Sequence, residues 1–195
     1  MDTTFTTQNI IRCALFTALI AVGAFIKIPI PVLPFTLQFL FTMLGGLLLG
    51  GELGAMSVLA YIALGLMGLP IFADGGGIAY ALRPTFGYLI GFCIASYVTG
   101  TIANKVGNPT LKRLLVANFI GLVIVYFCGT LYYWIISNFV INTPIGLWPL
   151  IFYCVILAMP GDIFLCIISA FLGKRLLPII KKSKLQYELE EERPS

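Results

Sequence analysis

The chain has 195 residues, of which 59% are apolar, 10% are charged and none is histidine. Soluble domains carry roughly 25% charged residues, so this composition excludes a water-covered globular domain and predicts one membrane domain over residues 1–195. The net charge of +4 does not indicate nucleic-acid binding, because the basic residues lie between and after apolar segments. We therefore expect a lipid bilayer around the chain and no nucleic-acid partner.

The apolar segments predict an all-α integral membrane protein. A membrane-crossing helix needs about 20 mostly apolar residues. Prolines at 29, 31 and 34 end the first apolar segment, and Gly50-Gly51 divides the second, which as one helix would be about 50 Å long. The sequence thus predicts six transmembrane helices, at about residues 10–28, 36–49, 53–67, 85–103, 114–136 and 150–177.

The first apolar segment follows Arg12 and resembles a signal peptide. No small-residue cleavage site precedes a polar domain, and more apolar sequence follows directly, so we interpret it as the first membrane helix. Residues 68–84 hold a glycine triplet and two prolines, which favour a loop, yet they are rich in apolar residues. We expect this loop to fold back on the helices and to close a pocket on the outer side.

Basic residues predict the orientation. An even number of crossings places both termini on one side, and cytoplasmic segments carry the excess of Lys and Arg. With both termini cytoplasmic, only Lys27 and Arg83 face outward, and the tail at residues 181–195 is cytoplasmic. The remaining basic residues then face inward: Arg12, Lys105, Lys112, Arg113, Lys174, Arg175, Lys181, Lys182, Lys184 and Arg193. The prediction is a multi-pass protein of the plasma membrane.

The sequence lacks most of the groups that enzyme catalysis requires. Without histidine there is no Ser/His/Asp set and no histidine metal ligand, and the chain has no P-loop pattern for ATP. The five cysteines form no C-x-x-C pair and lie in apolar segments, as buried small hydrophobic residues do. We expect no catalytic residues, no metal and no cofactor.

Two charged residues are candidates for ligand binding. Asp162 follows Pro160-Gly161 inside the last apolar segment, and a carboxylate at that depth faces a cavity or a partner. It is either a ligand contact or a hydrogen-bonded lock between helices. Arg83 begins the fourth helix, either as an anchor for an anionic group or as an interfacial residue reaching the headgroups. Tyr80 and Tyr88 are candidates for the wall of a pocket near it.

Small residues four apart form a smooth stripe on the first helix at Ala14 and Ala18. Such stripes allow close helix contact in lipid. The glycines at 46, 50 and 54 and those at 87 and 91 form similar stripes. Taken alone, each stripe indicates internal packing more than a partner site.

Five segments, in order, resemble a known family: residues 31–38 (PVLPFTLQ), 45–50 (GGLLLG), 68–73 (GLPIFA) with the glycines at 75–77, 83–92 (RPTFGYLIGF) and 159–162 (MPGD). The chain is similar to the biotin-specific substrate-binding subunits of energy-coupling factor (ECF) transporters, the BioY family. The resemblance extends from the first helix to the sixth. The Pro-Thr-x-Gly-Tyr block at residues 84–88, with the glycine-rich loop before it, is the most specific part, and the residue before this block is often uncharged in the family whereas here it is Arg83.

This resemblance implies a six-helix subunit that binds biotin from outside and associates with a transmembrane coupling protein and two ABC-type ATPases. ATP hydrolysis would then belong to the partners, which fits the missing P-loop. In the wider group, a small-residue stripe on the first helix contacts the coupling protein, and Ala14 and Ala18 match it.

Biotin has groups that the candidate residues can recognise. Arg83 can hold its carboxylate, and Asp162 can accept hydrogen bonds from its ureido N–H groups. Many family members carry lysine three residues after the aspartate, where this chain has Leu165. Weaker pocket candidates are Gln38, Asn118 and Tyr80.

Other interpretations remain. The same architecture can hold another small vitamin, or the chain can be a structural membrane subunit without a ligand. An intramembrane enzyme built on Asp162 would lack a second acid, a metal set and a nucleophile–base pair. Mass spectrometry of a co-purified ligand separates these interpretations.

Overall fold

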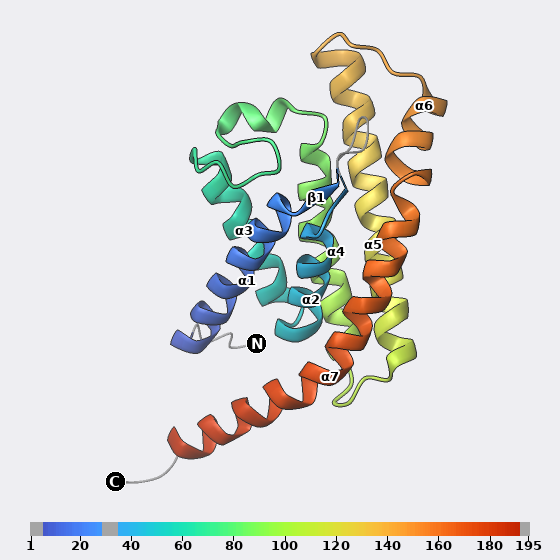
Figure 1. Ribbon diagram of the computed structural model, residues 1–195. Coiled ribbons are helices and arrows are strands. Elements are labelled where there is room, and N and C mark those ends of the chain that lie inside the picture. The colour runs from blue at the N-terminus through green and yellow to red at the C-terminus, as the bar shows by residue number, and fades with distance from the viewer. Residues whose placement is uncertain (1–5, 29–34, 192–195) are drawn as a thin grey trace.

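The computed structural model describes residues 6–28 and 35–191, with side chains described as far as residue 180. Pro29, Pro31, Pro34 and Arg193, which entered the sequence argument, lie outside the described residues. The major helices are α1 (Thr7–Phe25), α2 (Gln38–Leu49), α3 (Gly51–Leu66), α4 (Phe86–Asn104), α5 (Leu111–Ile135), α6 (Leu147–Ile151) and α7 (Met159–Glu191). They pack side by side as a helical bundle (Figure 1).

Among the described residues, four helical segments are long and apolar enough to cross a membrane: 7–25, 86–104, 111–140 and 147–180. Helices α2 and α3 are apolar but shorter. Many large apolar side chains on the outside of the bundle are exposed, as expected where helices contact lipid tails. The chain is thus a helical, multi-pass membrane protein.

The first predicted helix is three residues too long at its end. Helix α1 stops at Phe25, and β1 (Lys27–Ile28) pairs antiparallel with β2 (Phe35–Thr36). Lys27 lies opposite Thr36 and Ile28 opposite Phe35. Pairing satisfies backbone groups that a chain leaving a helix would otherwise expose.

The sixth predicted helix, 150–177, is interrupted and also longer than expected. It comprises α6, the π-helix η3 (Phe152–Ile156) and α7, with a turn at residues 157–158. The break therefore precedes Pro160-Gly161, which lie in the first turn of α7, where the missing proline N–H leaves no helical bond unmade. Part of the predicted tail is helical, because α7 continues to Glu191 through residues that favour helix.

Two glycines decide how α2, α3 and α4 meet. Gly50 adopts a φ of 89°, a left-handed conformation that lets a single residue separate α2 from α3. A Cβ on Gly100 of α4 would collide with the backbone of Gly46, Gly50 and Gly51. The glycine spacing thus serves internal packing at this crossing.

The loop at residues 68–85 folds back on the bundle, which confirms the prediction from its apolar composition. Phe72 is 1% exposed and packs edge-on against Tyr61 of α3 at 5.3 Å between ring centres. The Tyr61 hydroxyl donates a 2.9 Å hydrogen bond to the carbonyl of Ile71. The loop contains the 3-10 helix η1 (Ile78–Leu82), which leads into α4.

The start of α1 and the end of α7 lie at the same end of the bundle, and the connection between α4 and α5 lies there too (Figure 1). The β1–β2 pair and the loop at residues 68–85 lie toward the opposite end. The structure thus separates Lys105 in this connection, and Lys112 and Arg113 in the first turn of α5, from the segments bearing Lys27 and Arg83.

Candidate ligand-binding site

A pocket lies between α2, α4, α5 and the start of α7, at the end of the bundle opposite the termini. It contains about 690 Å³ of space free of atoms, a figure that includes space open to solvent. Side chains of β2 and of the loop at residues 68–85 complete its wall. The lining residues are Phe35, Thr36, Gln38, Phe39, Ala73, Asp74, Tyr80, Thr85, Tyr88, Leu89, Phe92, Val125, Tyr126, Ala158 and Asp162.

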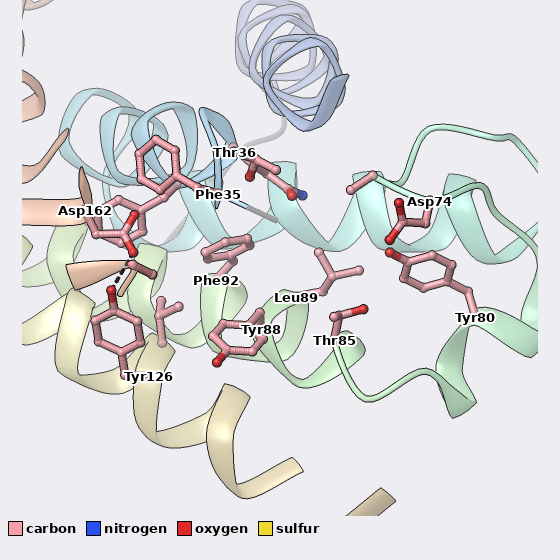
Figure 2. A pocket seen from close by; sticks show the side chains of 15 residues that line it. Phe35, Thr36, Asp74, Tyr80, Thr85, Tyr88, Leu89, Phe92, Tyr126 and Asp162 are labelled. Atoms are coloured by element: carbon pink, nitrogen blue, oxygen red, sulfur yellow. Dashed lines mark hydrogen bonds between the residues drawn. The ribbon is translucent and has the colours of Figure 1, made fainter. Parts of the chain in front are cut away.

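Helix α4 supplies one face of the pocket. Thr85, Tyr88, Leu89 and Phe92 follow the spacing i, i+3, i+4 and i+7, which places four side chains on one side of a helix. In Figure 2 the rings of Tyr88 and Phe92 and the side chain of Leu89 lie between the two polar ends of the pocket. This middle section is therefore suited to the apolar part of a ligand.

Asp162 and Tyr126 form one polar end (Figure 2). The Tyr126 hydroxyl donates a 2.6 Å hydrogen bond to Oδ2 of Asp162. Asp162 lies in the first turn of α7, where the helix dipole stabilises a negative charge. The two sequence interpretations of Asp162 both apply: it locks α7 to α5, and it lines the pocket.

Asp74, Tyr80 and Thr85 form the other polar end (Figure 2). Lys27 Nζ donates a 3.0 Å hydrogen bond to Oδ1 of Asp74, and Oδ2 lies 3.8 Å from a guanidinium nitrogen of Arg83. Lys27 Nζ also donates a 2.7 Å hydrogen bond to the carbonyl of Ala73. This end of the pocket is therefore backed by two cations that share one carboxylate.

Two polar atoms of the lining lack hydrogen-bond partners. Nε2 of Gln38, a residue that is 4% exposed, has none, and neither has the buried Oγ1 of Thr85. The Thr85 hydroxyl stands near the Tyr80 phenol, whose pKa is raised mainly by burial, without forming a hydrogen bond of ordinary geometry. Unpaired buried polar atoms are costly, so a polar ligand that reaches them gains affinity.

The structure brings four of the six predicted pocket residues together: Gln38, Tyr80, Tyr88 and Asp162 all line the cavity. Arg83 lies just outside the lining, with its guanidinium 5.2 Å from the centre of the Tyr80 ring.

Asn118 lies away from the pocket, fully buried in the bundle. Its Nδ2 donates a 2.9 Å hydrogen bond to the carbonyl of Cys166 on α7. Leu165, three residues after Asp162, is buried in the hydrophobic core. The described pocket lining therefore includes neither Asn118 nor Leu165, and it contains no Lys or Arg side chain.

Sequence reasoning missed several residues of the lining, among them Tyr126, Thr85 and Asp74. The helical position of Tyr88 was a signal that could have identified Thr85, because Thr85 lies three residues before Tyr88 on the same face. Nothing local in the sequence connects Tyr126 with Asp162, which is 36 residues further along the chain.

A second depression lies between α1 and α3, and its lining is almost wholly apolar. Ala14 and Ala18, the small residues of the stripe on α1, line it and are exposed. The other lining residues are Ile10, Cys13, Thr17, Ala21, Met56, Ala60, Leu64, Leu69 and Ile71. The stripe is thus open, with no other helix covering it in the part of the chain that the structure describes.

Fold and site together define a class: a helical, multi-pass membrane protein with a pocket lined by both apolar and polar side chains. Within that class the chain belongs to the BioY family, because the BioY family model matches residues 1–182.

Individual relatives agree with this assignment. The chain is 45% identical over 179 residues to the probable biotin transporter BioY of Lysinibacillus sphaericus, covering 91% of each chain. It is 34% identical to the biotin transporter BioY of Thermotoga maritima, covering 87% of this chain and 95% of that one. A solved structure, the S-component for biotin from an ECF-type ABC transporter, matches with a TM-score of 0.73 and 29% identity. That match covers 90% of this chain and 94% of the other.

Proposed function

We propose that this chain is the biotin-binding S component of an ECF-type vitamin uptake transporter. The relatives of similar length are biotin transporters by name, and the matching solved structure is a biotin S-component. The role is capture and delivery of biotin rather than catalysis.

The observation that carries this proposal is the two-ended pocket. Asp162 uses Oδ2 to accept a hydrogen bond from Tyr126, which leaves Oδ1 to accept hydrogen bonds from a ligand. The ureido ring of biotin has two N–H donors, so its place is at this end. The thiophane ring and alkyl chain then lie along Tyr88, Leu89 and Phe92. The carboxylate reaches the opposite end, beside Arg83 and the unpaired hydroxyl of Thr85.

Gln38 and Tyr80 are further proposed contacts, because both are buried and line the pocket. The unpaired Nε2 of Gln38 can donate a hydrogen bond to the ligand. Asn118 has no comparable geometry, since its amide nitrogen is already bonded to Cys166 and it lies outside the lining. Its proposed role is to hold α5 against α7.

We propose that the bilayer is crossed six times, with α2 and α3 as short crossings and α6 to α7 as one interrupted crossing. Both termini are then cytoplasmic, and the pocket opens to the outside. The basic connection between α4 and α5 lies at the end of the bundle where α1 begins and α7 ends, which supports this orientation.

Transport requires partners: a transmembrane coupling protein and two ABC-type ATPase subunits, since the chain has no P-loop of its own. The open apolar depression beside Ala14 and Ala18 is the proposed contact with the coupling protein. Small side chains let a partner helix approach closely there.

Isothermal titration of biotin against the purified protein tests the proposal. Asp162→Asn replaces an acceptor oxygen with a donor that faces a ligand N–H, so affinity should fall roughly tenfold or more. Glu52→Gln, which alters a carboxylate in the first turn of α3 outside the pocket, is the matched control and should bind as the wild type does. Absence of biotin binding by the wild type, or equal affinities for Asp162→Asn and wild type, would contradict the proposed site.

Arg83→Ala tests the other end of the ligand. It should weaken biotin and have little effect on biotinamide, which has no charge to lose. Equal weakening of both ligands would make Arg83 a structural or interfacial residue.

A further inference from the structure

Lys27, Asp74 and Arg83 form a charge cluster at the edge of the pocket, which we call the rim cluster. Asp74 alone of the three lines the cavity, and its two oxygens contact one cation each, Lys27 at 3.0 Å and Arg83 at 3.8 Å. The cluster draws on two segments far apart in the sequence, because Lys27 belongs to β1 and the other two to the loop at residues 68–85.

The rim cluster carries a surplus of one positive charge, since two cations share one carboxylate. All three side chains are between about a third and a half exposed, so the cluster is hydrated. Among the described side chains, both ion pairs of the structure involve Asp74. Asp162, at the other end of the pocket, has a tyrosine hydroxyl as its partner.

The pocket is therefore electrically asymmetric, with a carboxylate at one end and a net positive cluster at the other. A ligand with a neutral, donating head and a singly negative tail matches this asymmetry in one orientation. From this we infer that the rim cluster selects for a monoanionic ligand, with Lys27 as a specificity-determining residue and Asp74 as the group that limits the attraction. The inference rests on the proposed function and extends it to Lys27 and Asp74, for which the proposed function assigns no ligand contact.

The mechanism is electrostatic and does not need Lys27 to touch the ligand. Lys27 lies outside the lining and acts across Asp74, so what reaches the ligand is the net charge of the cluster. At about 8 Å and an effective dielectric constant of roughly 40 to 80, one unit charge changes the affinity for a monoanion by about twofold to sixfold. An uncharged ligand of the same shape is unaffected to first order.

A charge series tests the inference. Lys27→Gln lowers the cluster from +1 to 0, Asp74→Asn raises it to +2, and the double variant returns it to +1. Biotin affinity should fall by about twofold to sixfold for Lys27→Gln, rise by a similar factor for Asp74→Asn, and return near the wild-type value in the double variant. Biotinamide should bind the wild type and Lys27→Gln within about twofold, because Lys27 lies outside the lining, and the differences for biotin should shrink at high salt.

Titrations should use protein in nanodiscs of uncharged lipid, so that the lipid surface does not add its own potential. Lys105→Gln, at the opposite end of the bundle, is the matched control and should leave both affinities unchanged. The inference is overturned if Lys27→Gln weakens biotin and biotinamide equally. It is also overturned if Asp74→Asn weakens biotin as Lys27→Gln does, because the cluster would then act by holding the two segments together. Failure of the wild type to bind either ligand would instead overturn the proposed function, and this inference with it.

Discussion

The hydroxyl of Tyr126 donates a 2.6 Å hydrogen bond to Oδ2 of Asp162, which joins α5 to the first turn of α7 at one end of the pocket. Hydrogen bonds to charged groups are shorter and stronger than neutral ones. The contact holds Oδ2 against α5, so that in the proposed site Oδ1 is the oxygen left to face the ligand. Tyr126 thus acts as a positioning residue for Asp162.

Tyr126→Phe should weaken biotin by roughly threefold to tenfold, because Asp162 loses a donor that orients it. Biotinamide should lose the same factor, since both ligands carry the same ureido ring. Isothermal titration measures both, and Tyr97→Phe, which alters an exposed tyrosine of α4 outside the pocket, is the control. Unchanged affinity in Tyr126→Phe would show that Asp162 needs no orienting partner.

Asn118 should affect stability rather than binding. It is fully buried and its amide donates to the carbonyl of Cys166, so Asn118→Ala removes a hydrogen bond between α5 and α7. We expect a loss of about 0.5–1.5 kcal/mol in the free energy of unfolding, seen as a lower thermal midpoint in detergent, with biotin affinity of the folded protein unchanged. Asn108→Ala, at an exposed position between α4 and α5, is the control. A selective loss of biotin affinity without a change in midpoint would return Asn118 to the binding site.

The open stripe on α1 predicts a steric effect on assembly. Ala14→Trp and Ala18→Trp fill the depression between α1 and α3, so each should reduce co-purification of the coupling protein while leaving biotin affinity intact. Ala63→Trp places the same bulk on an exposed position of α3 outside the depression. If the three variants recover equal amounts of the coupling protein, this face is not the contact.

The proposed orientation can be read by labelling intact cells with a membrane-impermeant maleimide, in a variant without the five native cysteines. Ile78→Cys, at an 81% exposed position in η1, should react without permeabilisation. Val106→Cys, in the connection between α4 and α5, should react only after the membrane is opened. The reverse pattern would place both termini outside.

The sequence by itself determined the class of protein and much of the element order. Few charges and long apolar segments leave a membrane helix bundle as the way to satisfy the backbone in lipid, and Gly50 divides α2 from α3 as its conformational freedom predicts. The predicted end of α1 was wrong, because a pair of two-residue strands takes the place of the last helical turn that we expected. The break expected at Pro160-Gly161 lies before these residues instead, because a proline can begin a helix as well as interrupt one.

The site shows where sequence reasoning ends. Asp162 was identifiable because a carboxylate within an apolar segment is costly unless it has a partner. The identity of its partner, Tyr126, and the sharing of Asp74 between Lys27 and Arg83 were decided only by the tertiary structure. Periodicity reports which face of one helix a residue occupies. Which faces meet depends on how all the helices pack, and that packing also left Arg83 at the edge of the pocket and buried Asn118 away from it.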